Sequence, residues 1–249
     1  MKKTTRQRIR FILIFVSFLL FPVTIFYLAP SIAIKAAVHG ILCFSLLFFF
    51  GLFIVSLFLG RAHCGWACPG AGVTTLCAVA NNKPVKRAKW LKFVFWIPWF
   101  TAIIMLIVIK NGSVKGIEML YDMDSPISIM NNMGIVMYYA IVLLFIVLSL
   151  TVGKNSFCHH VCWMAPFMII GRSVANFTKM PSLRIKIESS TCIDGCKHCS
   201  NVCPMSIDLP KIISEKKYID SSDCTLCGEC VDACNKKVLS YTFGVKSKK

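Results

Sequence analysis

Four long stretches without a charged residue constrain the fold of this chain more than any other feature of its sequence. They cover residues 11–34, 36–60, 93–109 and 125–153. A helix that crosses the hydrocarbon core of a bilayer needs about 20 apolar residues, and each stretch approaches or exceeds that length. The third stretch is the shortest and contains Pro98. The sequence therefore predicts a membrane protein with a bundle of four transmembrane helices.

The first stretch also has the position of a secretory signal, because it follows a basic N-terminal segment. The apolar core of a signal peptide has only about 7–15 residues. Residues 11–34 form a much longer run, so we favour a span that is retained. The composition agrees with a membrane protein, since 56% of the residues are hydrophobic, 16% are charged and the mean hydropathy is +0.68.

Lysines and arginines are distributed unevenly between the two sides of the predicted spans. They gather before the first span, between the second and the third, and after the fourth, while the opposite loops hold only Lys35, Lys110 and Lys115. By the positive-inside rule, both termini lie in the cytoplasm, and the chain is a multi-pass protein of the cytoplasmic membrane. This topology accounts for most of the formal charge of +17, so the charge gives no reason to expect a nucleic acid as partner.

The hydrophobicity falls abruptly near Pro181, which indicates a domain boundary. We assign residues 1–162 to the transmembrane domain and residues 181–249 to a small cytoplasmic domain. That domain is rich in cysteine and would need metal to complete its core. Residues 163–180 mix apolar with basic side chains, which predicts an interfacial helix that connects the two domains. A plain linker helix fits this stretch equally well.

The cytoplasmic domain contains the most specific motif of the chain, a run of four cysteines with C-x2-C-x2-C-x3-C spacing. A similar run with C-x3-C-x2-C-x3-C spacing precedes it. In ferredoxins with two [4Fe–4S] clusters, three cysteines of each run bind one cluster and the fourth binds the other. We therefore predict a small α+β, ferredoxin-like domain with two clusters. The first would be held by Cys192, Cys196, Cys199 and Cys234, and the second by Cys203, Cys224, Cys227 and Cys230.

Zinc and disulfides are the alternative uses of these cysteines. Zinc sites usually take two well-separated C-x2–4-C pairs, and a third cysteine so close behind the second does not fit that spacing. Disulfides are disfavoured in the reducing cytoplasm. Two features depart from the usual ferredoxin pattern: three residues separate Cys192 from Cys196, and Asn235 follows Cys234 in place of proline.

Two further cysteine pairs, Cys64 with Cys68 and Cys158 with Cys162, follow the second and the fourth predicted spans. A C-x3-C spacing places both sulfurs of a pair on one face of a helix, and we expect the two pairs at the same membrane depth. They form a candidate third metal or cluster site, or a contact through which electrons pass between the membrane and the cytoplasmic domain. The alternative is that they are small buried residues at helix ends.

The remaining cysteines and the histidines carry weaker signals. Cys43 and Cys77 are isolated, and we expect both in the packed core. His63 and Trp66 are candidates for a quinone pocket by position only, and a structural role at a helix end is favoured for each. A b-type haem between two histidines is a lesser alternative, because His39 is predicted near the outer face and the other candidates near the inner one.

The segment from Arg61 to Pro69 (RAHCGWACP), the later Cys-x3-Cys pair and the two-cluster domain together resemble the NapH-type membrane-bound ferredoxins. Their superfamily also includes iron–sulfur proteins of nitrous-oxide reduction and a copper-reducing assembly factor (NapH/NosR/CcoG-like). The resemblance covers about residues 60–245. In this sequence Trp163, and not proline, follows Cys162. The resemblance implies a membrane-anchored protein that exchanges electrons with a quinol.

We therefore expect an electron-transfer subunit of a quinol dehydrogenase-like membrane oxidoreductase. Its two clusters would pass electrons one at a time between a quinol or quinone and another redox protein. An alternative of another class is a metal-ion reductase or metallocofactor assembly factor that binds a soft ion such as Cu(I) at Cys64, Cys68, Cys158 and Cys162. A third alternative is a scaffold with structural zinc and no redox role.

Overall fold

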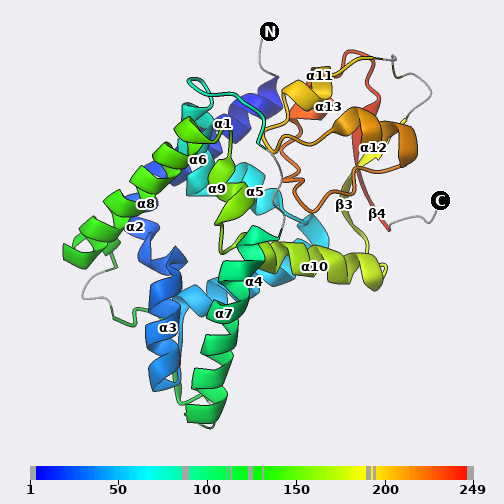
Figure 1. Cartoon of the computed structure of the whole chain (residues 1–249). Helices are drawn as coiled ribbons and strands as arrows, with labels where there is room; N and C mark the ends of the chain where they lie inside the picture. Colours follow the sequence, from blue (N-terminus) through cyan, green and yellow to red (C-terminus); the bar gives the residue numbers. More distant parts are fainter. Residues whose placement is uncertain are drawn as a thin grey trace.

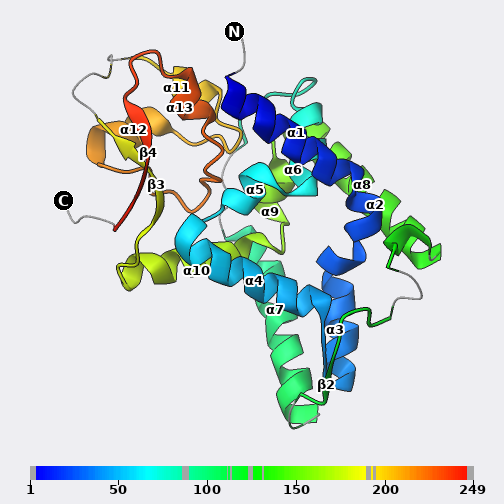
Figure 2. The same cartoon turned by 180° about the vertical axis from the view of Figure 1, so that it is seen from behind.

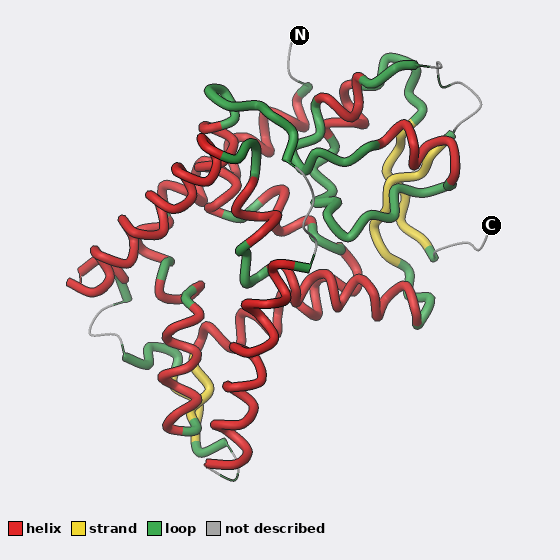
Figure 3. The backbone as a smooth tube through the Cα atoms, viewed as in Figure 1, coloured by secondary structure: helices red, strands yellow, loops and turns green. Residues whose placement is uncertain are grey.

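The computed structural model describes residues 4–85, 90–110, 112, 114–122, 126–130, 132–188, 192 and 195–245. Within these residues the chain is mostly helical, and the two sheets have two strands each (Figure 3). The N-terminal two thirds form an extended group of helices. The C-terminal third forms a smaller part that lies at one end of this group, beside the beginning of α1 (Figure 1).

The first predicted span is not one continuous helix. Its residues are distributed over four short helices: α1 (Thr5–Leu19), α2 (Phe21–Thr24), the 3-10 helix η1 (Phe26–Leu28) and α3 (Pro30–His39). The breaks follow the prolines, because Pro22 lies in the first turn of α2 and Pro30 begins α3. A proline has no backbone N–H and its ring blocks the preceding turn, so a helix starts at it more readily than it runs through it.

The second predicted span is also interrupted. α3 ends at Gly40, whose φ of 74° is a left-handed conformation that glycine adopts readily. The chain then forms the strand β1 (Ile41–Cys43), which pairs in parallel with β2 (Gly116–Glu118). The apolar helix α4 (Phe44–Leu59) follows with 16 residues. It is shorter than the length that the bilayer core usually requires.

The third and fourth predicted spans are continuous helices. α7 (Leu91–Met105) runs into the π-helix η2 (Leu106–Lys110), and α8 covers Asn132–Thr151. Two stretches, Leu91–Ile109 with 19 residues and Asn132–Thr151 with 20 residues, are long and apolar enough to cross a membrane. The described residues thus show two membrane-length helices, not the four that the charge-free stretches predict. A bundle of four transmembrane helices remains a prediction.

Short helices occupy the junctions between the longer ones. They are α5 (Ala62–Trp66), α6 (Pro69–Cys77), the 3-10 helix η3 (Ser128–Met130), α9 (Ser156–His160) and α10 (Ala165–Phe177). α10 lies along α4 (Figure 2), where Gly171 permits a close approach because a Cβ at this position would lie 1.9 Å from Oγ of Ser56. The ring of Phe167 stacks on Phe49, with centroids 5.3 Å apart. A helix thus lies within residues 163–180 and packs one face on α4, while its position at the membrane surface remains a prediction.

The C-terminal part is closed by a two-stranded antiparallel sheet. β3 (Ser182–Ile187) pairs with β4 (Leu239–Gly244) over their full lengths. Between the strands lie α11 (His198–Asn201), α12 (Leu209–Glu215) and α13 (Glu229–Ala233). The sheet brings the two ends of the cysteine-rich segment together. Its apolar side chains join a core of their own, which several of the cysteines share.

Candidate metal centres

Cys203, Cys224, Cys227 and Cys230 line one cavity in the C-terminal part. Cys203 follows α11, Cys224 and Cys227 lie in the segment before α13, and Cys230 lies within α13. The other walls of this cavity are mostly aliphatic. Burial, and then the nearby thiols Cys227 and Cys203, raise the pKa of Cys224 to about 12. The four thiols therefore lie close to one another around an apolar space.

Cys192, Cys196, Cys199 and Cys234 line a second cavity of about 210 Å³. Cys234 reaches it from the end of α13, whereas the other three lie before or within α11. The two cavities are neighbours. The pKa of Cys230 is raised by burial and by the three other thiols of the first cavity. It is also raised by Cys199, which lines the second cavity.

These two groups of four cysteines are the ones that the ferredoxin pattern predicts. In each group three cysteines come from one run and the fourth, Cys203 or Cys234, comes from the other run. The donor chemistry fits a [4Fe–4S] cluster, in which each iron takes one cysteine thiolate. Among the residues that the structure describes, no three His, Cys, Asp or Glu side chains are grouped so as to hold a single metal ion. Binding of iron by these eight cysteines remains a prediction.

The two membrane-proximal cysteine pairs also meet. Cys64 lies in α5, Cys68 precedes α6, Cys158 lies in α9 and Cys162 follows α9. Burial is the main cause that raises the pKa of Cys158, and the other three thiols raise it further. The sulfur of Met168 in α10 lies 3.9 Å from Sγ of Cys64. Four thiols and one thioether are thus gathered where the short helices end.

The two isolated cysteines lie apart from these groups. Cys43 is only 1% exposed at the start of α4, and Cys77 is half-buried at the end of α6. Both pack against the apolar core of the helical part, as predicted. His39 ends α3, where Tyr121 Oη lies 2.6 Å from its Nδ1.

The segment of residues 221–228, which carries Cys224 and Cys227 of the first cavity, lies directly against α5. We call it the 221–228 loop. The indole N–H of Trp66 donates to the carbonyl oxygen of Leu226 at 3.1 Å, and the hydroxyl of Tyr241 donates to the same oxygen at 2.7 Å. Leu226 has a φ of 51°, a left-handed conformation that is uncommon for leucine. The two hydrogen bonds hold the loop in this conformation.

Gly65 permits the close contact between α5 and the 221–228 loop. A Cβ at Gly65 would lie 2.5 Å from the carbonyl oxygen of Thr225, so any larger residue would have to displace backbone atoms. Gly65 follows Cys64 in the sequence, and Thr225 follows Cys224. The membrane-proximal thiols therefore adjoin the nearer of the two cavities.

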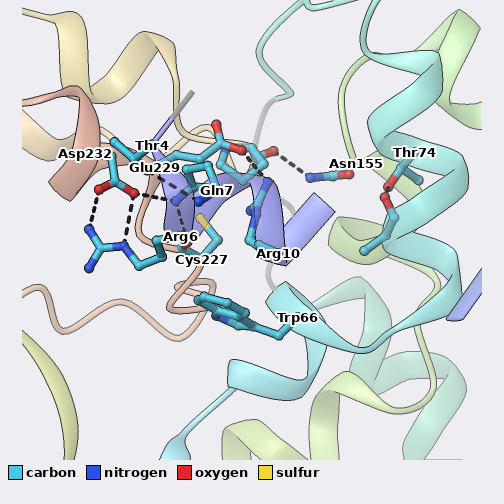
Figure 4. Close-up of polar contacts among 12 residues, drawn as sticks. Thr4, Arg6, Gln7, Arg10, Trp66, Thr74, Asn155, Cys227, Glu229 and Asp232 are labelled. Carbon is cyan, nitrogen blue, oxygen red and sulfur yellow. Dashed lines mark hydrogen bonds and ion pairs between the residues drawn. The ribbon is translucent and has the colours of Figure 1, made fainter. Parts of the chain in front are cut away.

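The N-terminal helix α1 makes a second contact with the C-terminal part, at α13 and the 221–228 loop (Figure 4). Nε of Arg6 donates to Asp232 at 3.1 Å, Arg10 pairs with Glu229, and the amide of Gln7 donates to a carbonyl of the 221–228 loop at 3.1 Å. In the sequence, the basic residues of this segment are interpreted only as a sign of topology. Their role in holding α13 was missed, although two acidic residues in one turn of a cysteine motif were an available signal.

A third contact comes from the junction of α8 and α9. Nζ of Lys154 donates to the carbonyl oxygen of Asn201 at 3.0 Å, and the amide of Asn155 donates to that of Pro204, also at 3.0 Å. Both acceptors flank Cys203 in the sequence. The helical part therefore holds the ligand segments of the nearer cavity from three directions.

A buried group of charges lies between the membrane-proximal thiols and the 221–228 loop. Nζ of Lys92 donates to Asp223 at 2.9 Å, and Nη1 of Arg61 lies 3.7 Å from the same carboxylate oxygen. None of the three residues is more than 2% exposed. Burial raises the pKa of Asp223, but Lys92 and Arg61 outweigh it and hold that pKa below its usual value. No local pattern in the sequence pairs these distant residues.

An open groove of about 520 Å³ is lined by residues of α1, α4, α5 and the β3–β4 sheet. Its lining is mainly apolar and includes Val55 and Leu59, which are 45% and 41% exposed on α4. Trp66 and Leu226 also line it. His63 lines it as well, and Nε2 of His63 is buried with no hydrogen-bond partner among the residues that the structure describes. Both candidate pocket residues from the sequence, His63 and Trp66, thus lie in one groove.

Two protein families match the chain. The family described as 4Fe–4S dicluster domain matches residues 184–235, which include both cysteine runs. The family described as 4Fe–4S binding domain matches residues 42–79 and 134–172, which include both membrane-proximal pairs. The ferredoxin-type proteins NapH of Haemophilus influenzae and of Escherichia coli are 27% and 26% identical to the chain over 190 and 194 residues. The chain is a distant NapH-like ferredoxin-type protein.

The alignments cover 73% of this NapH-like chain, and they span 62% of each of the two NapH proteins. The putative electron transport protein YccM of Escherichia coli is 24% identical over 202 residues, which are 73% of the chain and 50% of YccM. No solved structure matches the chain at a significant level. The comparisons confirm the resemblance to NapH, and both families that match the chain are described as 4Fe–4S domains.

Proposed function

We propose that this NapH-like protein passes electrons between a quinol or quinone in the membrane and another redox protein, through [4Fe–4S] clusters held at the cytoplasmic face. The observation that carries the proposal is the contact between α5 and the 221–228 loop. It joins the thiols next to the membrane helices to the nearer cluster cavity, with Gly65 against Thr225. Such a contact shortens the path for an electron between the two sites.

The cysteines of the two cavities are the proposed ligands of the two ferredoxin clusters. One cluster would be held by Cys192, Cys196, Cys199 and Cys234, and the other by Cys203, Cys224, Cys227 and Cys230. When bound, such a cluster supplies reversible uptake of one electron. The residues of the chain hold the thiols in place, exclude water with aliphatic walls, and fix both ligand segments against the helical part.

Cys64, Cys68, Cys158 and Cys162 are the proposed ligands of a third cluster. Two observations support this: the four thiols come together, and the match to a 4Fe–4S binding domain includes both pairs. With a cluster there, three sites would follow one another from the membrane surface to the far end of the C-terminal part.

The groove beside α5 supports a lipid-soluble quinone as the membrane carrier. Its volume of about 520 Å³ lies within the range of about 300–1,000 Å³ that small-molecule sites usually have. Exposed apolar residues of α4 give access from the lipid, and Leu226 on the opposite side belongs to the 221–228 loop. The ring of His63 offers a nitrogen that could form a hydrogen bond with a quinone oxygen.

Anaerobic reduction of the purified protein by a short-chain hydroquinone tests this function. Val55→Trp fills the groove, while the neighbouring Ile54→Trp adds the same bulk to an exposed position of α4 outside it. We expect cluster reduction to slow at least about tenfold in the first variant, as expected for loss of about 1.4 kcal/mol or more of binding, and to stay unchanged in the second. Equal rates in both would place the quinone elsewhere. Clusters that dithionite cannot reduce would contradict electron transfer itself.

We also propose that the protein lies in the cytoplasmic membrane, with both termini in the cytoplasm. The two membrane-length helices and the similarity to NapH indicate a membrane protein. The distribution of basic residues supports the orientation. Fusion of a cytoplasmic reporter to the C-terminus should give an active reporter. Activity of a periplasmic reporter at the same position would contradict this topology.

Copper-ion reduction or metallocofactor assembly is the second candidate function, and one contact favours it. Met168 Sδ lies 3.9 Å from Cys64 Sγ, and a thioether beside thiolates is a soft donor set suited to Cu(I). Replacement of Met168 by Leu keeps its apolar bulk and removes the thioether. A loss of copper binding in this variant, with unchanged iron content, would favour this second function; no change in either would speak against it.

A further inference from the structure

The charges buried beside the membrane-proximal thiols do not balance. Within the part of the chain that the structure describes, Arg61 and Lys92 share a single carboxylate, Asp223, and all three side chains are almost fully buried. A charge removed from water is strongly unfavourable unless an opposite charge and hydrogen bonds compensate it. One positive charge in this group therefore lacks a partner among the side chains of the group.

The next carboxylate does not restore the balance. Asp220 lies near Arg61, but it lies within electrostatic range of Arg172 and Arg184 as well. Arg172 donates to Ser182 at 2.8 Å and Arg184 donates to Asn176 at 2.7 Å, so neither has a carboxylate of its own in these contacts. Asp220 therefore has two other arginines within electrostatic range and does not serve as a counter-charge for Arg61 alone.

Arg61 extends toward the thiols. Its Nη2 lies 3.8 Å from Sγ of Cys64, and its charge also acts on Cys158 and Cys162. Its Nη1 donates to the carbonyl oxygen of Ser222 at 3.0 Å, which ties the guanidinium to the 221–228 loop. An arginine stays charged when it is buried, so this position carries a permanent cation next to the four thiols.

We propose that Arg61, with Lys92 behind it, is the charge partner of an anionic iron–sulfur cluster bound by Cys64, Cys68, Cys158 and Cys162. This inference rests on the third cluster of the proposed function. Four thiolates outweigh the positive charge of an iron–sulfur core, so the bound site is negative and becomes more negative when it takes up an electron. A fixed cation at this distance stabilises the reduced form more than the oxidised form. Arg61 is therefore a positioning residue that raises the reduction potential of this cluster.

Four full-length proteins, purified anaerobically in detergent, test the role of Arg61: the wild type, Arg61→Gln, Arg61→Lys and Arg184→Gln. Arg184 is a matched control because it is 1% exposed and belongs to β3. The readouts are iron per chain and the midpoint potential of each cluster, followed by electron paramagnetic resonance. The two ferredoxin clusters serve as an internal reference in every sample.

We expect Arg61→Gln to lose about four irons per chain, or to keep the third cluster at a lower potential, while the ferredoxin signals persist. Arg61→Lys should retain the cluster at a potential between those of the wild type and the Gln variant. Arg184→Gln should leave the third cluster unchanged. The proposal is overturned if Arg61→Gln leaves iron and potential unchanged, if Arg184→Gln has the same effect, or if the wild type binds only about eight irons. Absence of the ferredoxin clusters from the wild type would instead contradict the proposed function.

Discussion

Single residues decide how closely the helical part and the cluster-bearing segment approach. Gly65 has no side chain to separate α5 from Thr225, and Trp66 beside it donates to Leu226 across the same contact. Asp223, in the same loop, forms ion pairs with Arg61 and Lys92 of the helical part. The contact thus depends on a few positions, and substitution of any of them should be measurable.

Gly65→Ala should weaken this contact. The new methyl group would lie 2.5 Å from a backbone oxygen that cannot rotate away, and such overpacking costs about 1–3 kcal/mol. We expect a lower temperature at which the visible cluster absorbance is lost, and slower reduction of the ferredoxin clusters by hydroquinone. Gly51→Ala is the control, because a Cβ at Gly51 would have no atom of the described residues within 4 Å. An equal effect of the two substitutions would argue against the contact.

Asp223→Asn should destabilise the protein more than a surface substitution does. It leaves Lys92 and Arg61 buried without their shared carboxylate, and loss of one partner from a buried ion pair costs about 3–5 kcal/mol. Chemical unfolding followed by tryptophan fluorescence would measure this. The double variant Lys92→Met, Asp223→Leu should lose less stability than Asp223→Asn alone. A larger loss in the double variant would contradict the ion-pair explanation.

Among the elements, α1 has two roles: its apolar residues pack in the helical part, and its basic beginning holds α13. Arg6 pairs with Asp232 and Arg10 pairs with Glu229 (Figure 4). The pairs are only partly buried, so each contributes modestly, but together they connect the first helix to the last one. The basic N-terminus is therefore part of the architecture and not only a signal for membrane insertion.

Exchange of the charges in one pair tests this docking. Arg6→Glu should destabilise the C-terminal part by about 1 kcal/mol or less, as partly exposed pairs do. Asp232→Arg in addition should restore part of the loss. The restored stability should decrease at high salt, because exposed charges are screened. Melting curves of the three proteins at two salt concentrations measure it; no recovery in the double variant would show that Arg6 acts by packing.

The continuous elements of the structure could be predicted from the sequence, while the interrupted ones could not. α7 and α8 are uniform apolar helices, so counting uncharged residues found them. The same count joined α1, α2 and α3 into one span, because it does not register that Pro22 and Pro30 start new helices. The grouping of cysteines in the two cavities follows from their spacing. The roles of Gly65 and Asp223 could not be predicted, because each contacts residues that are far away in the sequence and no local pattern marks such contacts.

At the scale of the whole molecule, the groups of thiols form a series. The membrane-proximal group adjoins the cavity of Cys224 across α5, and that cavity adjoins the one of Cys234 through α13. The groove lined by Val55 and Trp66, the proposed quinone site, opens beside the first contact. In the proposed function, this order would give electrons a direct route from the membrane to the end of the C-terminal part, where Cys192 and Cys196 are exposed.

The amount of iron, acid-labile sulfide, zinc and copper per chain tests this account most directly. Anaerobically purified wild-type protein should contain about twelve irons with matching sulfide, as expected for three [4Fe–4S] clusters. The double variant Cys64→Ser, Cys158→Ser should retain about eight, held by the two ferredoxin clusters. Zinc in place of iron, after full reconstitution, would contradict the proposed electron transfer altogether.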